Sequence, residues 1–458
     1  MAKAKKKETL TPEERLQAAL VPDWEQPYKL PENWCWAYWG ACGNFQAGSA
    51  FKNEYQGLTE YEIPFYKVGS LKYSNSDGFL YDTSNTVSEE IRNKLKAVLI
   101  PENSIIFAKI GEAIRLNRRS INPVACCIDN NLMSFCAKTC LTKYAYFWSL
   151  GIDLYNYTNA TTVPAIRKSD LEKVAFPLAP CAEQQRIVDR IESLFTKLDE
   201  AKQKAQDALD SFETRKAAIL HKAFTGEFTA RWRKEHNVGM ESWDYPRFED
   251  CILKMQNGLA KRSGSSGTSF VVLRLANLSD NGFVTDDLRE ILLDEKEQKN
   301  YCLKDNDVLM IRVNGSKDNV GKQFLFYGKL KWAFCDHIIR ITYKTNISHE
   351  YMVYFSKTNT YRRYIEDNMV SSAGQNTISR KGMASLLIPI PLMDEQTEIV
   401  RILDDLLAKE QQAKETAEAV LEQIDLMKKS ILARAFRGEL GTNDPAEESA
   451  VELVKENI

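Results

Sequence analysis

The stretch EQQRIVDRIESLFTKLDEAKQKAQDALDSFETRKAAILHKAFTGEF, residues 183–228, returns later as EQTEIVRILDDLLAKEQQAKETAEAVLEQIDLMKKSILARAFRGEL, residues 395–440. The two copies align without a gap at an offset of 212 residues, and 17 of the 46 aligned positions are identical. Both begin with Glu-Gln, and both contain Ala-Phe-x-Gly-Glu near their end. An ungapped match of this length indicates an internal duplication, and this duplication decides how the chain is organised.

Apolar residues recur with a 4-3-4-3 spacing in both copies. The spacing runs from Ile187 to Ile219 in the first copy and from Ile399 to Ile431 in the second. A repeat of 3.5 residues over several heptads predicts a coiled coil. Neither Pro nor Gly occurs between Ala182 and Gly226, where a helix C-cap is expected. We therefore predict two long helices over residues 183–228 and 395–440.

One polar residue interrupts the apolar pattern in each copy, namely Arg215 in the first and Glu410 in the second. If the helices pair antiparallel with residue numbers that sum to 625, these two residues face each other and every other layer is apolar. An Arg–Glu pair in such a seam fixes the register more than it adds stability. The sequence therefore predicts a contact between Arg215 and Glu410.

The segments that precede the two helices are rich in short β-type runs, and they echo each other. Lys67-Val68-Gly69-Ser70 stands where the second segment has Arg274-Leu275-Ala276-Asn277, and Thr162-Val163-Pro164 aligns with Gly374-Gln375-Asn376. The expected organisation is a domain with an N-terminal lead, a helix, a second domain, a second helix and a tail, over residues 1–182, 183–228, 229–394, 395–440 and 441–458.

Several elements of these domains can be predicted locally. Thr11 before Pro12 is typical of a helix start, so a short helix is expected over Pro12–Leu20. Trp34, Trp36 and Trp39 are expected in a hydrophobic core. Strands are expected at Ile63–Val68, Ala97–Ile100, Ser104–Ile110, Phe270–Leu275, Asp307–Val313 and His337–Thr342.

The composition is that of a soluble globular protein, with 27% charged residues, 44% hydrophobic residues and a net charge of -2. Any DNA-binding surface must therefore be local. There is no apolar run long enough to span a membrane, and the basic residues 2–7 lack the apolar core of a signal peptide. The ten cysteines lack zinc spacing. We expect reduced thiols in a cytoplasmic protein without a structural metal.

Motifs for autonomous catalysis are missing. Gly315–Lys322 comes nearest to a phosphate-binding loop, but five residues separate its glycines and Gln323 replaces the Ser or Thr that binds magnesium. It can be a glycine turn after the strand Asp307–Val313, but we favour a DNA-contacting loop. Asn122-Pro123-Val124 and Asp444-Pro445-Ala446 do not supply the Asn/Asp-Pro-Pro-aromatic run of an adenine methyltransferase. No catalytic residue and no cofactor are expected.

This organisation resembles the specificity subunit of a type I restriction-modification system. The resemblance covers nearly the whole chain and is strongest in the two helical repeats, in Leu273–Leu278 and in Gly374–Ser379. It implies an α+β fold with two target-recognition domains, each mixed and β-rich. Two long helices would separate them and form an antiparallel coiled coil, and a pseudo-twofold axis would relate the two halves.

The resemblance also implies a function and partners. Each domain would read one half of a bipartite site in double-stranded DNA, and the chain itself would be non-catalytic. Two methyltransferase subunits would dock on the helical regions, and restriction nuclease-translocase subunits would join them. A helix of about 40 residues spans roughly 60 Å, enough to separate two half-sites about one DNA turn, or 34 Å, apart. The paired helices would then act as a ruler.

Basic, amide and small polar residues in loops suit contacts with phosphates and base edges. On this basis the candidate DNA-binding residues of the first domain are Lys67, Ser70, Lys109, Arg115, Asn117, Arg118 and Arg119. Those of the second domain are Lys261, Arg262, Arg274, Asn277, Arg312, Asn314, Ser316, Lys317, Gln375, Asn376, Arg380 and Lys381.

The starts of the two helices are the candidate partner-binding regions, because the resemblance assigns methyltransferase docking to such regions. The residues are Gln184, Gln185, Arg186, Asp189, Glu395, Gln396, Thr397 and Glu398. Two alternatives stay open. The chain could be a coiled-coil scaffold whose duplicated domains bind proteins or glycans, which the net charge of -2 mildly favours. It could also be an autonomous nuclease or methyltransferase, which the missing motifs oppose.

Overall fold

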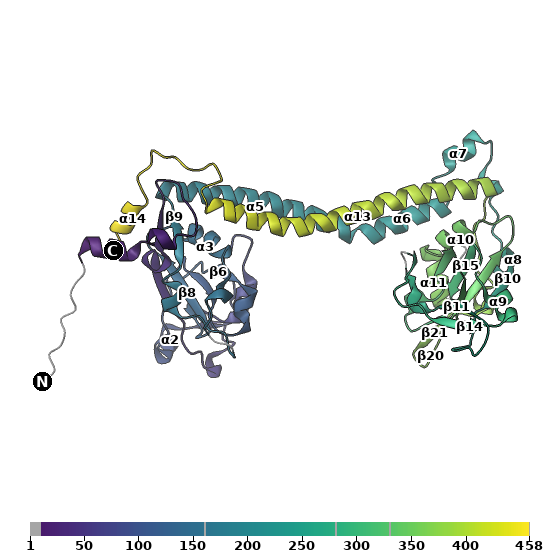
Figure 1. The fold of residues 1–458 in the computed structure, drawn as a ribbon, viewed down its shortest axis with the longest axis horizontal. Helices are drawn as coiled ribbons and strands as arrows, with labels where there is room; N and C mark the ends of the chain where they lie inside the picture. The colour runs from purple at the N-terminus through teal and green to yellow at the C-terminus, as the bar shows by residue number, and fades with distance from the viewer. Residues whose placement is uncertain (1–10, 160–161, 280–281, 329–330, 458) are drawn as a thin grey trace. The chain divides into compact units, whose positions relative to one another are not determined.

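The structure is a computed structural model that describes residues 11–159, 162–279, 282–328 and 331–457. The basic segment at residues 2–7 lies outside the described residues. The chain divides into two compact units. Unit 1 comprises residues 1–204 and 420–458, and unit 2 comprises residues 205–419. Each unit contains one β-rich domain and parts of both helical repeats (Figure 1).

Three helices form the two helical repeats: α5 (Cys181–Asp210), α6 (Phe212–Phe224) and α13 (Met393–Ala435). The first repeat, predicted as one helix, is therefore interrupted at Ser211. The carbonyl of Ala208 accepts hydrogen bonds from the Ser211 hydroxyl at 3.2 Å and from Arg215 Nη1 at 3.1 Å. Side chains that occupy a helical carbonyl in this way disturb the backbone hydrogen-bond ladder and divide the helix.

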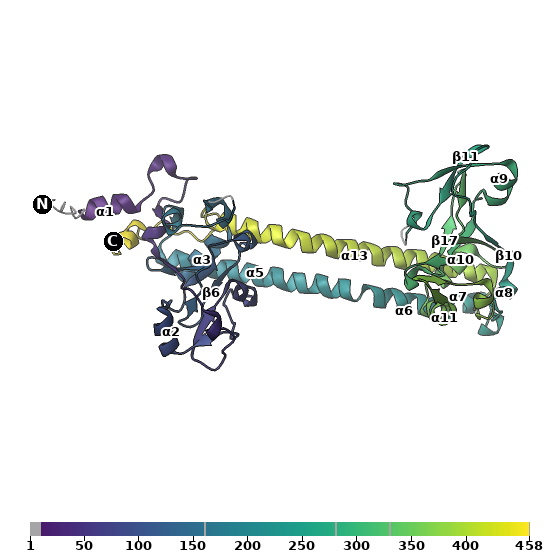
Figure 2. The same ribbon diagram turned by 90° about the horizontal axis from the view of Figure 1, so that it is seen from below.

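The helices pair antiparallel within each unit (Figure 2). In unit 1, Lys428 Nζ lies 2.5 Å from Asp199 Oδ1, and Lys202 Nζ lies 4.0 Å from Asp425 Oδ1. In unit 2, the ammonium of Lys414 lies 5.0 Å from the ring centroid of Phe212. Residue numbers fall along α13 as they rise along α5 and α6, so the predicted antiparallel pairing is confirmed.

The domain of unit 1 is built from three small sheets. The largest has the strand order β2 (Gly43–Ala47), β8 (Leu132–Ala137), β5 (Ile105–Ala108), β6 (Arg119–Ile121). The second has the order β4 (Thr86–Val87), β3 (Ile63–Tyr66), β7 (Cys127–Ile128), and the third pairs β1 (Cys35–Tyr38) with β9 (Ala175–Leu178). Helices α1 (Pro12–Ala19), α2 (Glu89–Leu95), α3 (Thr142–Leu150), α4 (Lys168–Leu171) and α14 (Val451–Lys455) complete the unit.

The domain of unit 2 repeats this topology. Its four-stranded sheet has the order β10 (Ile252–Asn257), β19 (Ile338–Tyr343), β15 (Asp307–Ile311), β17 (Gln323–Phe326). A three-stranded sheet has the order β14 (Glu290–Leu293), β11 (Thr268–Leu273), β18 (Trp332–Phe334). In both domains the central strand of the three-stranded sheet runs antiparallel to one neighbour and parallel to the other. The predicted duplication therefore extends to the sheets.

Unit 2 carries further elements around these sheets. A second three-stranded sheet has the order β16 (Val313–Asn314), β21 (Gln375–Thr377), β20 (Val370–Ser372), and β12 (Leu278–Ser279) pairs with β13 (Gly282–Phe283). Its helices are α7 (Ala230–Glu235), α8 (Phe248–Cys251), α9 (Glu295–Tyr301), α10 (His349–Phe355), α11 (Asn359–Asn368) and α12 (Arg380–Met383). None of the helices within the described ranges is long and apolar enough to cross a membrane.

Most predicted local elements are present. The helix after Thr11 begins at Pro12, and Trp34, Trp36 and Trp39 are buried. Strands lie within or overlap the predicted ranges except Ala97–Ile100, which forms only a single bridge between Ile100 and Cys126. That prediction is wrong because Lys96 adopts a left-handed conformation (φ 52°) that ends α2, and the Val98 amide then donates to the Ser49 hydroxyl at 3.2 Å instead of to a neighbouring strand.

Candidate nucleic-acid interface

The candidate DNA-binding residues of unit 2 fall into two groups. The first group surrounds the sheet of β16, β21 and β20. Strand β16 pairs with β21 through Val313↔Thr377 and Asn314↔Asn376, and the Ile378 amide donates to the Arg312 carbonyl at 3.0 Å. This pairing brings together residues that are more than 50 positions apart in the chain: Arg312, Asn314, Ser316, Lys317, Gln375, Asn376, Arg380 and Lys381.

Asn376 of this group is buried, so it is not available to a base. Its amide nitrogen donates to the carbonyl of Gly315 at 2.9 Å, and its amide oxygen accepts from the hydroxyl of Ser371 at 2.6 Å. A buried amide that satisfies backbone groups in this way positions a loop. Asn376 is therefore corrected from a candidate DNA contact to a residue that ties the β20–β21 turn to the loop after β16.

The second group of unit 2 has cations that are paired with acids. Lys261 lies 2.8 Å from Glu297, Arg262 lies 3.3 Å from Asp336, and Arg274 lies 2.7 Å from Asp287. Cys335 and His337 flank Asp336, and one ligand atom of each of the three lies within 4.8 Å of the others. The Arg262 guanidinium beside Asp336 opposes a bound cation at this cluster by charge repulsion.

Ser70 and Asn277 occupy equivalent turns and are both buried. The Lys67 amide donates to Ser70 Oγ at 3.0 Å, and the Arg274 amide donates to Asn277 Oδ1 at 2.9 Å. Each side chain thus closes a short turn after the central strand of a three-stranded sheet. Both residues are corrected from DNA contacts to structural ones, because a buried polar atom already engaged by the backbone cannot reach a base edge. Lys67 is half-buried and donates to Gln56 at 2.7 Å.

The predicted basic cluster of unit 1 is likewise only partly accessible. Arg119 is 4% exposed, and its guanidinium donates to the carbonyls of Asn117 at 2.6 Å and Ile152 at 2.7 Å. Burial lowers the pKa of Arg119 to about 10, so it keeps its charge at neutral pH. Arg119 is corrected from a phosphate contact to an internal one, because it is buried and both of its Nη atoms bind carbonyls.

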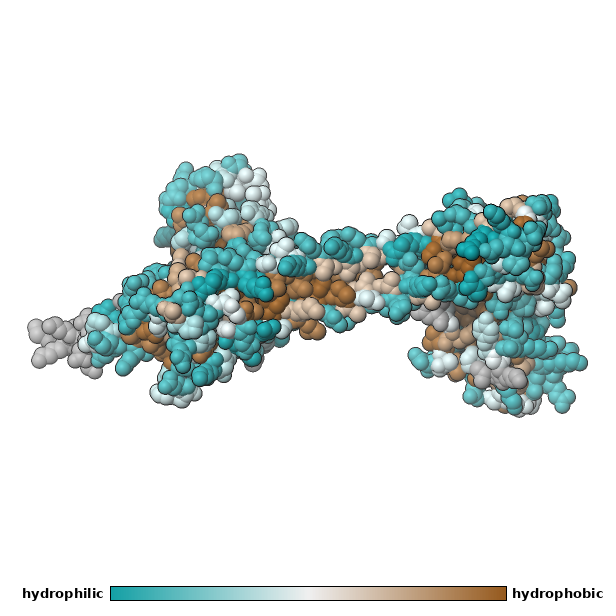
Figure 3. Space-filling view, turned by 90° about the horizontal axis from the view of Figure 1, so that it is seen from above, coloured by the Kyte–Doolittle hydropathy of each residue, from teal (hydrophilic) through white to brown (hydrophobic). Residues whose placement is uncertain are grey.

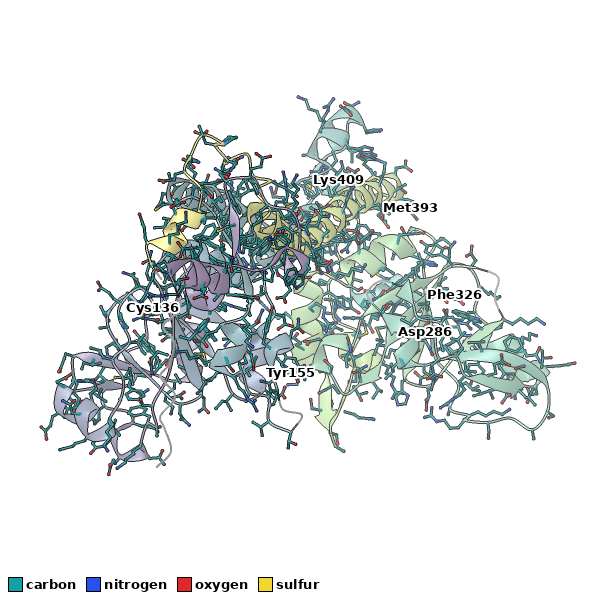
Figure 4. All side chains as sticks on the ribbon, turned by 60° about the vertical axis from the view of Figure 1, so that its left-hand side comes forward. Cys136, Tyr155, Asp286, Phe326, Met393 and Lys409 are labelled. Atoms are coloured by element: carbon teal, nitrogen blue, oxygen red, sulfur yellow. The ribbon has the colours of Figure 1, made fainter. Side chains whose placement is uncertain are left out.

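The neighbours of Arg119 differ in exposure. The Asn117 amide nitrogen donates to the Ile152 carbonyl at 3.0 Å, which makes this residue structural rather than DNA-binding. Arg115 is exposed and lies 3.7 Å from the ring centroid of Tyr155, which Figure 4 labels. Arg118 is exposed, and its side chain has no partner among the described residues. Lys109 is half-buried, and its amide donates to the Asn131 carbonyl at 2.8 Å.

The Glu-Gln start of α13 is internal. Glu395 is fully buried and accepts from Arg233 Nη1 at 2.6 Å, from the Thr229 hydroxyl at 2.6 Å and from Trp243 Nε1 at 3.1 Å. Gln396 is also fully buried and binds the backbone of Ser348 at 2.8 Å. Both are corrected from partner-binding residues to structural residues, because no atom of either side chain reaches the surface.

The equivalent start of α5 is built on the same plan. Glu183 is fully buried and accepts from Trp34 Nε1 at 2.7 Å, from Asn443 Nδ2 at 2.8 Å and from the Thr442 hydroxyl at 3.2 Å. The Gln184 amide oxygen accepts from the Leu141 amide at 2.8 Å. Gln184 is therefore corrected in the same way as Gln396.

The other candidate partner-binding residues are exposed or half-buried, and each already has a neighbour. Gln185 donates to Asp189 at 2.7 Å. Arg186 pairs with Glu447 at 2.7 Å, and Glu398 pairs with Arg401 at 2.7 Å. The Thr397 hydroxyl donates to the Met393 carbonyl at 3.0 Å. Sequence reasoning could not separate these residues from their buried neighbours, since the polar pattern is the same for both.

The Ala-Phe-x-Gly-Glu motif at each helix end has a defined role that the sequence did not reveal. In unit 2 the ring centroid of Phe224 lies 4.9 Å from that of Tyr351, and in unit 1 that of Phe436 lies 5.1 Å from that of Tyr144. Each tyrosine hydroxyl donates to a proline carbonyl, at 2.6 and 2.7 Å. Each helix therefore ends in the core of the unit that contains the start of the other helix. The repeated Phe was the available signal.

Arg215 and Glu410 are in contact within unit 2, with Arg215 Nε 2.8 Å from Glu410 Oε2. Arg215 also donates to the hydroxyl of Ser211. Apolar side chains reach the surface elsewhere on the long helices, as Figure 3 shows, and include Leu426 and Met427, which are 66% and 46% exposed. Arg215 thus performs two tasks, pairing across the helices and occupying the carbonyl at the break between α5 and α6.

A comparison with known families accounts for this organisation. The model of the type I restriction modification DNA specificity domain matches residues 42–209 and 275–423, which together exceed half of the chain. The chain belongs to this family. Each matched segment covers most of one domain of the specificity family and most of the helix that follows it.

Curated members of the specificity family resemble the chain over nearly its full length. The specificity subunit of the type I restriction enzyme StySPI from Salmonella potsdam is 28% identical over 429 residues, which is 90% of each chain. The specificity subunit of the type I restriction enzyme EcoKI from Escherichia coli is 24% identical over 432 residues, again 90% of each chain. These relatives are similar to this chain in length as well as sequence.

A solved structure shares the fold of this family member. The HsdS subunit from Thermoanaerobacter tengcongensis aligns with a TM-score of 0.63 at 18% identity, covering 91% of this chain and 100% of that one. The predicted fold class, an α+β specificity subunit with two domains and paired long helices, is confirmed by this fold match and by the duplicated family match.

Proposed function

We propose that this chain is the sequence-recognition subunit of a type I restriction-modification complex, and that each domain reads one half of a bipartite DNA site. The observation that carries the proposal is the repeated match to a DNA specificity domain, once in each unit. A duplicated reader is suited to two half-sites, because two similar domains present two similar surfaces to one duplex. The chain supplies recognition and carries no catalytic step of its own.

Exposed cations without side-chain partners among the described residues support contact with DNA phosphates. They are Arg118 in unit 1 and Lys317, Arg380 and Lys381 in unit 2. Phosphate contacts by Arg and Lys supply affinity that falls steeply with salt. The net charge of -2 does not oppose this, since a DNA-binding surface can be local.

The long helices are proposed to set the distance between the half-sites. Helix α13 has 43 residues, which corresponds to about 64 Å at 1.5 Å per residue. The Arg215–Glu410 pair supports a single register for the helices. Inserting one heptad into each long helix is expected to lengthen the spacer by about three base pairs, since seven residues add about 10 Å. Both half-site sequences are expected to stay unchanged.

Two methyltransferase subunits and restriction nuclease-translocase subunits are the proposed partners, acting with this chain in the cytoplasm. The exposed or half-buried residues at the helix starts are the candidates for docking: Gln185, Arg186, Asp189, Thr397 and Glu398. Leu426 and Met427 add exposed apolar surface on α13. A contiguous exposed apolar patch rimmed by polar residues is typical of a surface that another protein covers.

Base-modification mapping tests the proposal. Cells that carry the chain and its methyltransferase subunits are compared with cells that lack only this chain, and modified bases are mapped across the genome. A bipartite modified motif that disappears with the chain is expected. If the motif is retained in cells that lack the chain, the proposal is contradicted. The scaffold alternative, in which the duplicated domains bind proteins or glycans, is then favoured.

A further inference from the structure

Strands β20 and β21 of unit 2 form a ribbon, and β16 pairs with β21 at its base. The register Val370↔Thr377, Ser371↔Asn376 and Ser372↔Gln375 leaves Ala373 and Gly374 as a two-residue turn. Both turn residues have positive φ, at 49° and 76°. This is the turn geometry whose twist matches that of paired strands, and it is costly for alanine because its Cβ crowds the backbone. The ribbon is therefore a specified feature of this domain.

One face of the ribbon is fastened to the domain. Ser371 and Asn376 are a cross-strand pair on this face, and their side chains are hydrogen-bonded to each other. Asn376 also donates to the carbonyl of Gly315 at 2.9 Å, and Ile378 at the base of the ribbon is fully buried. These contacts hold the ribbon in one orientation relative to the loop after β16.

The opposite face makes no such contacts with the described part of the chain. Side chains alternate across a strand, so Val370, Ser372, Gln375 and Thr377 share this face. Val370 is 68% exposed, and Ser372 and Gln375 are exposed. The amide of Gln375 has no hydrogen-bond partner among the described residues. A rigid ribbon thus presents an amide, a hydroxyl and an apolar group side by side.

These groups match the chemistry of the DNA major groove. That groove admits a two-stranded ribbon, a glutamine amide can bind adenine through two hydrogen bonds, and small apolar groups contact the thymine methyl. Cations belong to the elements next to the ribbon: Arg312 and Lys317 lie on either side of β16 in the chain, and Arg380 and Lys381 lie in the first turn of α12, which follows β21. Such cations can hold the adjacent phosphates.

We infer that the β20–β21 ribbon enters the major groove of one half-site and that Gln375 reads a base there, with an adenine as the matching base. The inference rests on the proposed function and names the element that would give unit 2 its specificity. Asn376 and Ser371 then act as positioning residues, because they hold the reading face without reaching a base.

The test uses the full chain assembled with its methyltransferase subunits. Modification motifs and DNA binding at several salt concentrations are compared for the wild type, Gln375→Ala and the double variant Arg380→Ala with Lys381→Ala. Gln375→Ala is expected to lose about fivefold to 100-fold of the discrimination at one base pair of one half-site. The double variant is expected to weaken binding at all sequences and to lower the salt slope by about one for each lost phosphate contact.

Gln17→Ala is the matched control, since Gln17 is an exposed glutamine on α1 of unit 1. It is expected to leave both half-sites unchanged. A second variant, Ala373→Gly, favours the turn and should retain the wild-type motif, which shows that a substitution in the ribbon does not by itself change the motif. An unchanged motif in Gln375→Ala, with the salt slope lowered in the cation variant, overturns the inference while the proposed function stands. Absence of any sequence-specific binding by the wild-type complex overturns both.

Discussion

Glu183 and Glu395 occupy the same position in the two repeats and are equally buried, yet they are stabilised by different chemistry. Glu395 accepts hydrogen bonds from the guanidinium of Arg233, the hydroxyl of Thr229 and the indole of Trp243. Among the described residues, Glu183 accepts side-chain hydrogen bonds only from neutral groups, which belong to Trp34, Thr442 and Asn443. The indole is common to both, whereas the charged partner is present in one unit alone.

The comparison shows what the duplication holds constant. A buried carboxylate must have its lone pairs occupied, but an arginine or a group of amides and hydroxyls can do this equally well by geometry. The energetic consequence differs, because removing one member of a buried ion pair leaves an uncompensated charge. We call the buried sites of these two glutamates the Glu183 junction and the Glu395 junction. The same substitution should therefore change the free energy of unfolding by different amounts at the two junctions.

The largest effect is expected for Glu395→Gln. This change keeps the shape of the side chain but leaves Arg233 buried without its counter-charge, and it should destabilise unit 2 by about 3–5 kcal/mol. Hydrogen exchange measured by mass spectrometry on peptides from residues 226–243 reports the change locally. Glu398→Gln, in the same turn but on an exposed pair, is the control. Equal protection in Glu395→Gln and wild type would contradict the ion-pair assignment.

Glu183→Gln should have a smaller effect. No arginine is left unpaired, but the three donors lose a charged acceptor, and hydrogen bonds to charged groups contribute about 1.5–3 kcal/mol. The measurement is exchange in peptides from residues 181–190 and 438–447, with unit 2 peptides as the internal reference. A loss as large as that of Glu395→Gln would mean that the charged partner in unit 2 makes no difference.

Asn443→Ala tests the Glu183 junction by removing a hydrogen-bond donor instead of the acceptor. Removing one of the three donors to Glu183 leaves part of the carboxylate unsatisfied and should cost about 1–2 kcal/mol. Asn457→Ala, an exposed asparagine of the same tail whose amide binds only the Leu453 carbonyl, is the control. The free energy of unfolding of unit 1 is compared by exchange, and an equal response to both variants would remove Asn443 from the junction.

The smallest effect is expected for the Arg215–Glu410 pair. Their side chains are 36% and 21% exposed, so solvent screens the charges and the interaction should contribute no more than about 1 kcal/mol. A double-mutant cycle of Arg215→Ala and Glu410→Ala measures this coupling. A coupling energy above about 3 kcal/mol would place this pair with the buried junctions.

Sequence analysis predicted best the features that depend on a regular spacing of residues along the chain. The 3.5-residue spacing led to the antiparallel helices and to the facing positions of Arg215 and Glu410, since that spacing depends only on helix geometry. The duplicated sheets were foreshadowed by the weaker echo between Lys67–Ser70 and Arg274–Asn277. These inferences needed no knowledge of which polar atoms are buried.

The candidate site was predicted less well for a physical reason. Ser70, Asn277 and Asn376 have the composition of base-reading residues, but each is used by nearby backbone groups. Arg119 and Glu395 were misassigned in the same way, because a charged side chain is solvated in most sequences and buried only when the fold supplies partners. Those partners lie far away in the chain, as Arg233 does for Glu395, and one sequence does not reveal them.

Unit 1 is formed by two separate segments of the chain, which affects the order in which the two units can fold. Its core includes Phe436, Ala450 and Val454, and Asn443 completes the junction at Glu183. During synthesis on the ribosome these residues emerge after unit 2, which is one uninterrupted stretch of the chain. Domains tend to fold as units while the chain emerges. The domain of unit 1, although its strands are made before those of unit 2, therefore acquires its full core only after unit 2 has been synthesised.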